Sequence, residues 1–116
     1  MQHITTTARY NAEFPFAVVY PPQRMADVLA GSISKKVAKQ SHIAETKKYT
    51  HVTVFNGGVE KEFGNEDSHL ISSPKVAAYD LQPEMRAQEV ADKVAEVVKT
   101  KEHEFTMCNF APLDIV

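Results

Sequence analysis

The sequence has little cysteine and no long apolar run, and each shortage excludes a class of protein. The single cysteine, Cys108, rules out a disulfide within the chain and favours a reducing compartment. No apolar stretch approaches the roughly 20 residues that a transmembrane helix needs. Residues 1–11 are polar and rich in threonine, so they lack the apolar segment of a secretory signal. We therefore expect a cytoplasmic protein with no membrane partner.

Charge of neither sign dominates. The chain has 13 lysine and arginine residues against 15 aspartate and glutamate residues, for a net charge of -2. This balance leaves no electrostatic footprint for nucleic acid or for an anionic membrane surface. With 116 residues, of which 43% are hydrophobic, the chain is long enough for one modest core. We expect at most one domain and no nucleic-acid partner.

The clearest predicted element is a helix over Ala87–Thr100. Its valines, including Val98, fall on one face and its charged residues on the other. Arg86 stands at the expected N-cap, so a capping side chain is lacking. A second helix is predicted to open at Pro22 and run towards Val37. Gly31 lies inside it, at a cost of about 1 kcal/mol relative to alanine, and is a point where it could break.

Short apolar runs predict strands between these helices. Glu45–Phe55 fits either a helix or a strand, and it ends in a turn at Asn56-Gly57-Gly58. Cys108 is expected to be a small buried thiol inside an apolar strand. Strands and helices in alternation favour an α/β fold with a mainly parallel sheet flanked by helices. The strands are predicted at Ser41–Ala44, His69–Ser72 and Phe105–Asn109, with Phe14–Tyr20 as a strand or the start of a loop.

In such sheets, functional groups gather beyond the carboxyl ends of the strands. Two polar groups occupy that position here: residues 45–48 follow one predicted strand, and Asn109 and Asp114 follow another. Spacing alone makes both groups weak candidates. A pair of lysines after a strand is usually solvated, and an aspartate in a proline-containing loop usually forms a turn.

Longer motifs carry more information, because from Phe14 to Val116 the sequence resembles the 2,3-bisphosphoglycerate-independent phosphoglycerate mutases. The motifs occur in the family's order and at nearly its spacing. They include His42-Ile43-Ala44-Glu45-Thr46 with Lys48-Tyr49, Phe55-Asn56-Gly57-Gly58-Val59-Glu60-Lys61, Ser73-Pro74-Lys75-Val76-Ala77, Tyr79-Asp80-Leu81-Gln82-Pro83-Glu84-Met85 and Met107-Cys108-Asn109-Phe110-Ala111-Pro112.

The resemblance implies a fold and an activity. Members of the family interconvert 2- and 3-phosphoglycerate in glycolysis, using two manganese ions and a serine nucleophile. They have an alkaline-phosphatase-like domain with a transferase domain inserted in it. Residues 14–116 would then form part of the phosphatase-like domain, and residues 1–13 a flexible segment or linker.

The resemblance also implies two functional residues. Lys48 matches the family lysine that contacts the phosphate, and we expect it to be catalytic. Asp114 matches the first metal-binding aspartate of the pattern Pro-Asp-Met-Val-Gly-His-Thr-Gly, which here reads Leu113-Asp114-Ile115-Val116. A carboxylate oxygen is a suitable ligand for manganese. Phosphoglycerate would be the substrate of the complete enzyme.

Several departures from the family affect these expectations. The histidine ligand of the metal pattern would lie beyond Val116, and the family's serine nucleophile and glycerate-binding arginines have no counterpart here. Lys47 replaces a usual glutamate beside Lys48. The resemblance therefore predicts a mutase fragment that is inactive alone and that self-associates or pairs with the remaining mutase segments. The alternative is a degenerate, non-catalytic paralogue that acts as an interaction module, which the starting Met1 and these departures favour.

Overall fold

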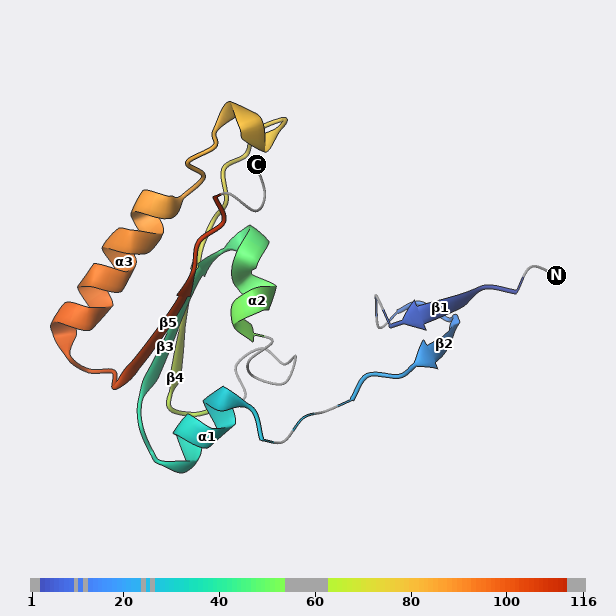
Figure 1. Ribbon diagram of the computed structural model, residues 1–116, viewed down its shortest axis with the longest axis horizontal. Helices are drawn as coiled ribbons and strands as arrows, with labels where there is room; N and C mark the ends of the chain where they lie inside the picture. The colour runs from blue at the N-terminus through green and yellow to red at the C-terminus, as the bar shows by residue number, and fades with distance from the viewer. Residues whose placement is uncertain are drawn as a thin grey trace.

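A computed structural model describes residues 3–9, 11, 13–23, 25, 27–53 and 63–112. Its main feature is a three-stranded parallel sheet with α3 on one face and α2 on the other; a two-stranded parallel sheet lies apart from it (Figure 1). The elements are β1 (Thr5–Ala8), β2 (Ala17–Tyr20), α1 (Leu29–Lys35), β3 (Gln40–Glu45), the 3-10 helix η1 (Thr46–Lys48), α2 (Tyr49–Thr53), β4 (Glu66–Ile71), the 3-10 helix η3 (Tyr79–Leu81), α3 (Ala87–Thr100) and β5 (Phe105–Asn109).

Strand β3 is the centre of the larger sheet, whose order is β4-β3-β5. Gln40 of β3 lies opposite both Glu66 of β4 and Phe105 of β5, and the register runs in parallel from there. The carboxyl ends of all three strands therefore meet at one edge of the sheet. The predicted α/β fold with a mainly parallel sheet and flanking helices is confirmed.

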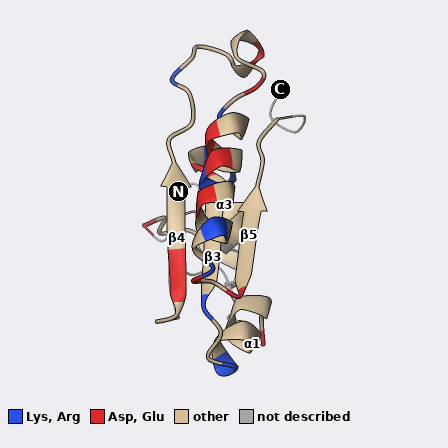
Figure 2. Ribbon diagram, turned by 90° about the vertical axis from the view of Figure 1, so that its left-hand side faces the viewer, with Lys and Arg blue, Asp and Glu red and all other residues tan. Residues whose placement is uncertain are grey.

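The core lies between β3 and α3. Ile43 packs with Val90 and Val97 of the helix, all three of them buried. Burial of each such side chain stabilises the fold by about 1.5–3 kcal/mol. The charged residues of α3 lie on its outward face (Figure 2). The predicted helix bounds are confirmed, but the expectation for Val98 is wrong, because this residue is 57% exposed.

The two ends of α3 show how the helix begins and stops. As expected, Arg86 makes no side-chain cap. Its guanidinium instead donates a hydrogen bond to the Glu89 carboxylate over 2.8 Å. A carboxylate in the first turn complements the helix dipole. Lys101 ends the helix in the left-handed conformation, with φ 55°.

Helix α1 is shorter than predicted. It begins at Leu29 rather than at Pro22, and its N-cap residue, Val28, supplies no side-chain hydrogen bond. Gly31 is buried inside α1 without breaking it. The helix ends before Val37, which takes a left-handed conformation with φ 59°. A helix start without a capping side chain forgoes about 1 kcal/mol.

Three strand-related expectations meet different outcomes. The ambiguous stretch after Glu45 is helical as η1 and α2, while the predicted turn at Asn56-Gly57-Gly58 lies outside the described residues. Strand β4 begins at Glu66, before the predicted start, because the ladder with β3 extends through polar residues. The expectation that Cys108 is buried is wrong: β5 is an outer strand of the described sheet, and Cys108 is exposed.

The parallel pair β1–β2 carries exposed apolar side chains, Val19 and Tyr20 among them. Thr5–Ala8, inside the segment expected to be a flexible segment or linker, forms β1. A domain boundary after residue 13 stays a prediction. Within the described segments, no helix combines the length and apolar character that crossing a bilayer requires.

Candidate functional site

The structure places Lys48 directly beyond the carboxyl end of the central strand. Strand β3 ends at Glu45, and η1 carries Lys48 within the next turn. The Lys48 side chain is only 5% exposed. Few lysines are so deeply buried unless a compensating charge or ligand accompanies them. Asp114, the predicted metal ligand, lies outside the described residues.

Hydrogen bonds fix η1 against the segment that follows β4. The hydroxyl of Ser73 donates to Glu45 Oε2 over 2.8 Å, and it accepts from the backbone N–H of Lys47 over 3.2 Å. The Thr46 hydroxyl donates to the carbonyl of Ile71 over 3.3 Å. These bonds join the ends of β3 and β4. The backbone that carries Lys48 is therefore held by two neighbouring strands.

Strand β5 brings a further polar side chain to the same edge. Asn109 lies opposite Ala44 in the ladder and is half-buried. It borders a pocket of about 260 Å³ shared by α2 and β5. Residues 45–48 and Asn109 are thus confirmed to lie at the same sheet edge, while Asp114, the other member of the second predicted cluster, lies outside the described residues. The pocket is lined by His51, Val52, Met107, Cys108 and Asn109.

A buried polar cluster on the face of β3 opposite α3 was missed from the sequence. Gln40 donates through Nε2 to the carbonyl of Ala30 over 3.1 Å, so its Oε1 faces His42 Nε2 at 3.3 Å. This makes Nε2 the protonated nitrogen of the imidazole. His42 Nδ1 lies 3.7 Å from Glu66 Oε1. Burial lowers the pKa of His42, although the Glu66 charge opposes the shift.

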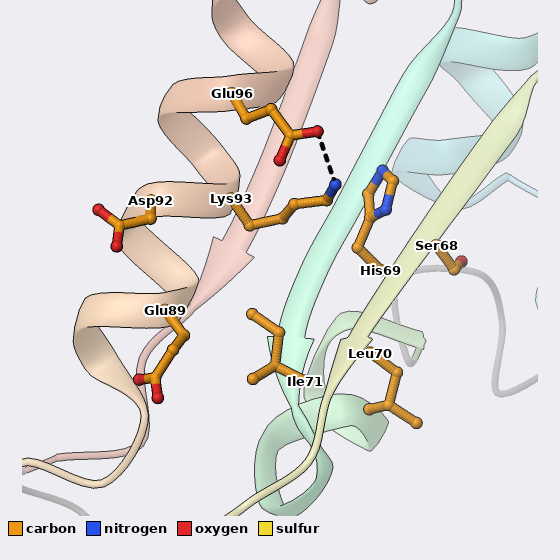
Figure 3. A pocket seen from close by; sticks show the side chains of 8 residues that line it. All are labelled: Ser68, His69, Leu70, Ile71, Glu89, Asp92, Lys93 and Glu96. Atoms are coloured by element: carbon orange, nitrogen blue, oxygen red, sulfur yellow. Dashed lines mark hydrogen bonds and ion pairs between the residues drawn. The ribbon is translucent and has the colours of Figure 1, made fainter.

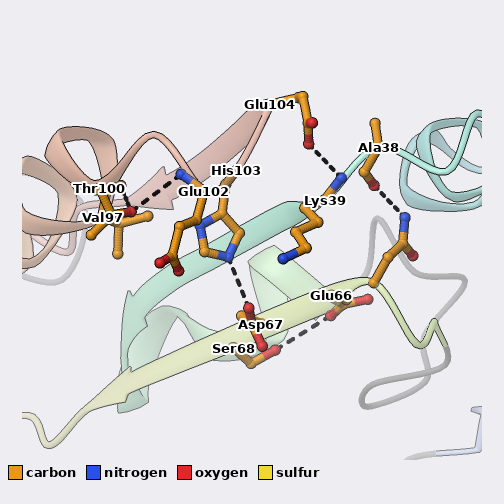
Figure 4. A network of polar contacts seen from close by, with 11 residues as sticks. Ala38, Lys39, Glu66, Asp67, Ser68, Val97, Thr100, Glu102, His103 and Glu104 are labelled. Carbon is orange, nitrogen blue, oxygen red and sulfur yellow. Dashed lines mark hydrogen bonds and ion pairs between the residues drawn. The ribbon is translucent and has the colours of Figure 1, made fainter.

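A second polar network ties together the amino-terminal edge of the sheet (Figure 4). His103 Nε2 lies 2.8 Å from Asp67 Oδ2, joining the start of β5 to β4. The backbone N–H of Lys39 donates to Glu104 Oε2 over 2.6 Å. This edge lies opposite Lys48, so the network holds the strands in register and does not contribute to the candidate site.

A pocket of about 520 Å³ lies between β4 and α3 (Figure 3). His69 projects towards Lys93, which donates to Glu96 over 2.9 Å. Burial, and then the positive charge of Lys93, lower the pKa of His69. Within the described segments, no three histidine, cysteine or acidic side chains come close enough together to hold a metal ion. The lining is Ser68, His69, Leu70, Ile71, Glu89, Asp92, Lys93 and Glu96.

With this geometry in place, comparison with known families is decisive, since the family model described as "Metalloenzyme superfamily" matches residues 2–116. The chain belongs to the Metalloenzyme superfamily. A crystal structure of Leishmania mexicana phosphoglycerate mutase, determined at low cobalt concentration, superposes with a TM-score of 0.76. That match covers 90% of this chain and 20% of the Leishmania chain at 21% identity, and it shows a shared fold.

Relatives in sequence agree with the resemblance that the motifs indicate. The 2,3-bisphosphoglycerate-independent phosphoglycerate mutase of Brugia malayi is 54% identical over 117 residues, covering 100% of this chain and 22% of the relative. That of Caenorhabditis elegans is 53% identical over 109 residues, covering 93% and 20%. That of the bacterium Herpetosiphon aurantiacus is 47% identical over 115 residues, covering 98% and 21%. The chain spans about a fifth of the length of these relatives.

Proposed function

We propose that this chain forms part of a metal-dependent phosphoglycerate mutase that interconverts 2- and 3-phosphoglycerate without 2,3-bisphosphoglycerate. Identity of 54% along the whole chain to such a mutase supports the proposal, as does membership of the superfamily. The observation that carries it is the position of Lys48: a nearly buried ammonium at the carboxyl edge of a parallel sheet, where α/β proteins bind their ligands.

Lys48 suits the role of stabilising a phosphoryl group during transfer. Phosphoryl transfer develops charge on the phosphate oxygens, and a preorganised cation in a water-poor site stabilises that charge strongly. The backbone of η1 is fixed by bonds from Thr46 and to Ser73. Burial of Lys48 also restricts its side chain before substrate arrives, which lowers the cost of binding.

Metal binding needs residues beyond those described. No described group of three ligands can hold an ion, so the described part of the chain does not by itself form a metal site. We propose that Asp114 supplies one oxygen ligand to a manganese site that other segments of the mutase complete. The superfamily's name and the presence of cobalt in the study of the Leishmania mutase support a metal, and carboxylates suit manganese.

The chain alone is proposed to be inactive and to act by pairing with the remaining mutase segments in the cytoplasm. Strands β4 and β5 border the described sheet, each with one edge that has no partner strand there. Such edges favour pairing with another segment. Copies of the chain could associate through the same edges when those segments are absent.

A coupled enolase assay tests the proposal in two steps. The 116-residue chain with manganese should give no turnover. Adding the other four-fifths of the Brugia malayi mutase, expressed separately, should restore turnover, and Lys48→Ala should abolish it. Turnover by the chain alone that Lys48→Ala removes would contradict the claim of inactivity. A mixture that assembles, yet has activity independent of Lys48, would contradict the role of this lysine.

A further inference from the structure

A separate pocket of about 330 Å³ opens beside η1 at the carboxyl edge of the sheet. Its volume is at the lower end of the range for small-molecule sites. Two lysines and four hydroxyl groups border it, and none of its described lining residues is acidic. The lining is Thr46, Lys47, Ser72, Ser73, Pro74, Lys75, Val76 and Tyr79.

We propose that this pocket binds a small phosphorylated anion through Lys47 and Lys75. The site is distinct from Lys48, which does not line it. It therefore stands whether or not the chain takes part in a mutase. Its ligand is recognised by a dianionic phosphate group, carried either by free inorganic phosphate or by a small phosphorylated hydroxy acid.

Lys47 is held in position on both its backbone and its side chain. Its N–H donates to Ser73 Oγ, and its Nζ lies 5.6 Å from the centroid of the Tyr79 ring. A lysine over an aromatic face gains a cation–π interaction of about 0.5–1 kcal/mol at an exposed site. The contact limits the rotamers of a side chain that would otherwise lose conformational entropy on binding.

Two of the four hydroxyl groups of the pocket donate hydrogen bonds to groups outside its lining. The Ser73 hydroxyl donates a hydrogen bond to Glu45, and the Thr46 hydroxyl donates one to the carbonyl of Ile71. The donors that remain for a ligand are the ammonium groups of Lys47 and Lys75 and the hydroxyl groups of Ser72 and Tyr79. Glu45 lies behind the pocket and is fully buried, so its carboxylate does not face a ligand.

Charge matching selects phosphate over carboxylate. A phosphate monoester carries about -1.5 to -2 charges at neutral pH, which two ammonium groups balance. A single carboxylate would leave one ammonium unmatched. Lys47 and Lys75 therefore supply the two positive charges that a phosphate group requires.

Amide chemical shifts of the ¹⁵N-labelled 116-residue chain, followed during a titration with inorganic phosphate at constant ionic strength, test the proposal. Saturable shifts are expected at Lys47, Ser73 and Lys75. Lys47→Gln and Lys75→Gln should each weaken binding about tenfold, the loss of one charge-assisted contact. Lys99→Gln, the same charge change on an exposed part of α3, should leave binding unchanged. The free-state spectra of the variants verify their folding.

Three results would overturn the proposal: shifts that do not saturate, equal weakening by Lys99→Gln, or no weakening by either pocket variant. Parallel titrations with 3-phosphoglycerate and with glycerate identify the source of the ligand. Tighter binding of 3-phosphoglycerate supports a phosphorylated hydroxy acid, and equal binding of phosphate supports the free ion. Glycerate binding as tightly as phosphate would contradict recognition of phosphate. Phosphate binding should persist in Lys48→Ala, which separates this result from the mutase proposal.

Discussion

The hydroxyl of Ser73 donates a hydrogen bond to the buried carboxylate of Glu45 across 2.8 Å. This contact joins the segment after β4 to the last residue of β3. Glu45 immediately precedes η1, so the same contact fixes the start of the turn that carries Lys47 and Lys48. The other oxygen of Glu45 is buried without a hydrogen-bond partner among the described residues. The carboxylate therefore depends strongly on Ser73.

Removing that hydroxyl should destabilise the fold measurably. Ser73→Ala leaves a buried carboxylate without its described hydrogen bond, which should lower the free energy of unfolding by about 1–3 kcal/mol. Urea denaturation measures the change. Ser72→Ala, at the exposed neighbouring position, is the matched control and should stay within about 0.5 kcal/mol of the parent. Equal effects of the two variants would show that the Ser73 contact carries no special weight.

Replacing Val37 with glycine should stabilise the fold. Val37 takes a left-handed conformation just after α1 and is 84% exposed, so little packing is lost when its side chain is removed. The left-handed conformation costs an L-residue about 1–2 kcal/mol, and glycine avoids this cost. Part of the stabilisation is lost again because glycine makes the unfolded chain more flexible. Val37→Gly should raise the free energy of unfolding by about 0.5–1 kcal/mol. A decrease, or the same gain from Val37→Ala, would contradict strain at this position.

Ile43 is the central core contact between β3 and α3. Ile43→Ala should lower the free energy of unfolding by about 2–5 kcal/mol, because it removes apolar contacts and leaves a cavity. Thermal denaturation followed by circular dichroism checks the loss. Leu81→Ala, at an exposed apolar position, should change stability little. A loss below 1 kcal/mol for Ile43→Ala would mean that α3 does not pack on this strand as described.

Stability should fall as the pH drops below about 6.5. Burial lowers the pKa of both His42 and His69 from an ordinary value of 6.5. The unfolded chain then binds protons more readily than the folded chain, so protonation favours unfolding. The stability from these two histidines is fully present above that pH and is lost as pH falls towards the lower folded pKa values. Urea midpoints at about pH 7.5 and about pH 5.5 measure the slope.

Variants separate the contributions of the two histidines. His42→Gln and His69→Gln should each flatten the dependence, and the double variant should flatten it more. A midpoint that rises at the lower pH would contradict neutral imidazoles in the folded chain. His51→Gln, at an exposed position, is the control.

Periodicity predicted the fold where a helix or strand packs on one face. The bounds of α3 and β5 follow from regular apolar spacing, and β3 was found within a residue at each end. The wrong predictions share one cause, because tertiary contacts that the local sequence does not encode decided these positions. Glu66 belongs to a strand because it pairs with β3 and its side chain is buried, which a polar residue does not signal. Val98 and Cys108 are apolar by type but face outwards.

The candidate site was predictable only in part. The strand-end rule placed residues 45–48 and Asn109 at one edge, and the family resemblance selected Lys48 from among them. The contact between Ser73 and Glu45 joins positions 28 apart in sequence, so no local pattern indicates it. The cluster of Gln40, His42 and Glu66 depends on strand register in the same way.

The most direct measurement inserts this chain into the Brugia malayi mutase in place of its matching segment and assays the chimera with manganese. At 54% identity over the whole chain, the segment should fold in that context. The account predicts turnover of 3-phosphoglycerate, and a loss of at least about a hundredfold in kcat when Lys48→Ala removes the cation beside the phosphoryl group. A folded, metal-loaded chimera that is inactive, or one whose activity survives Lys48→Ala, would contradict the account.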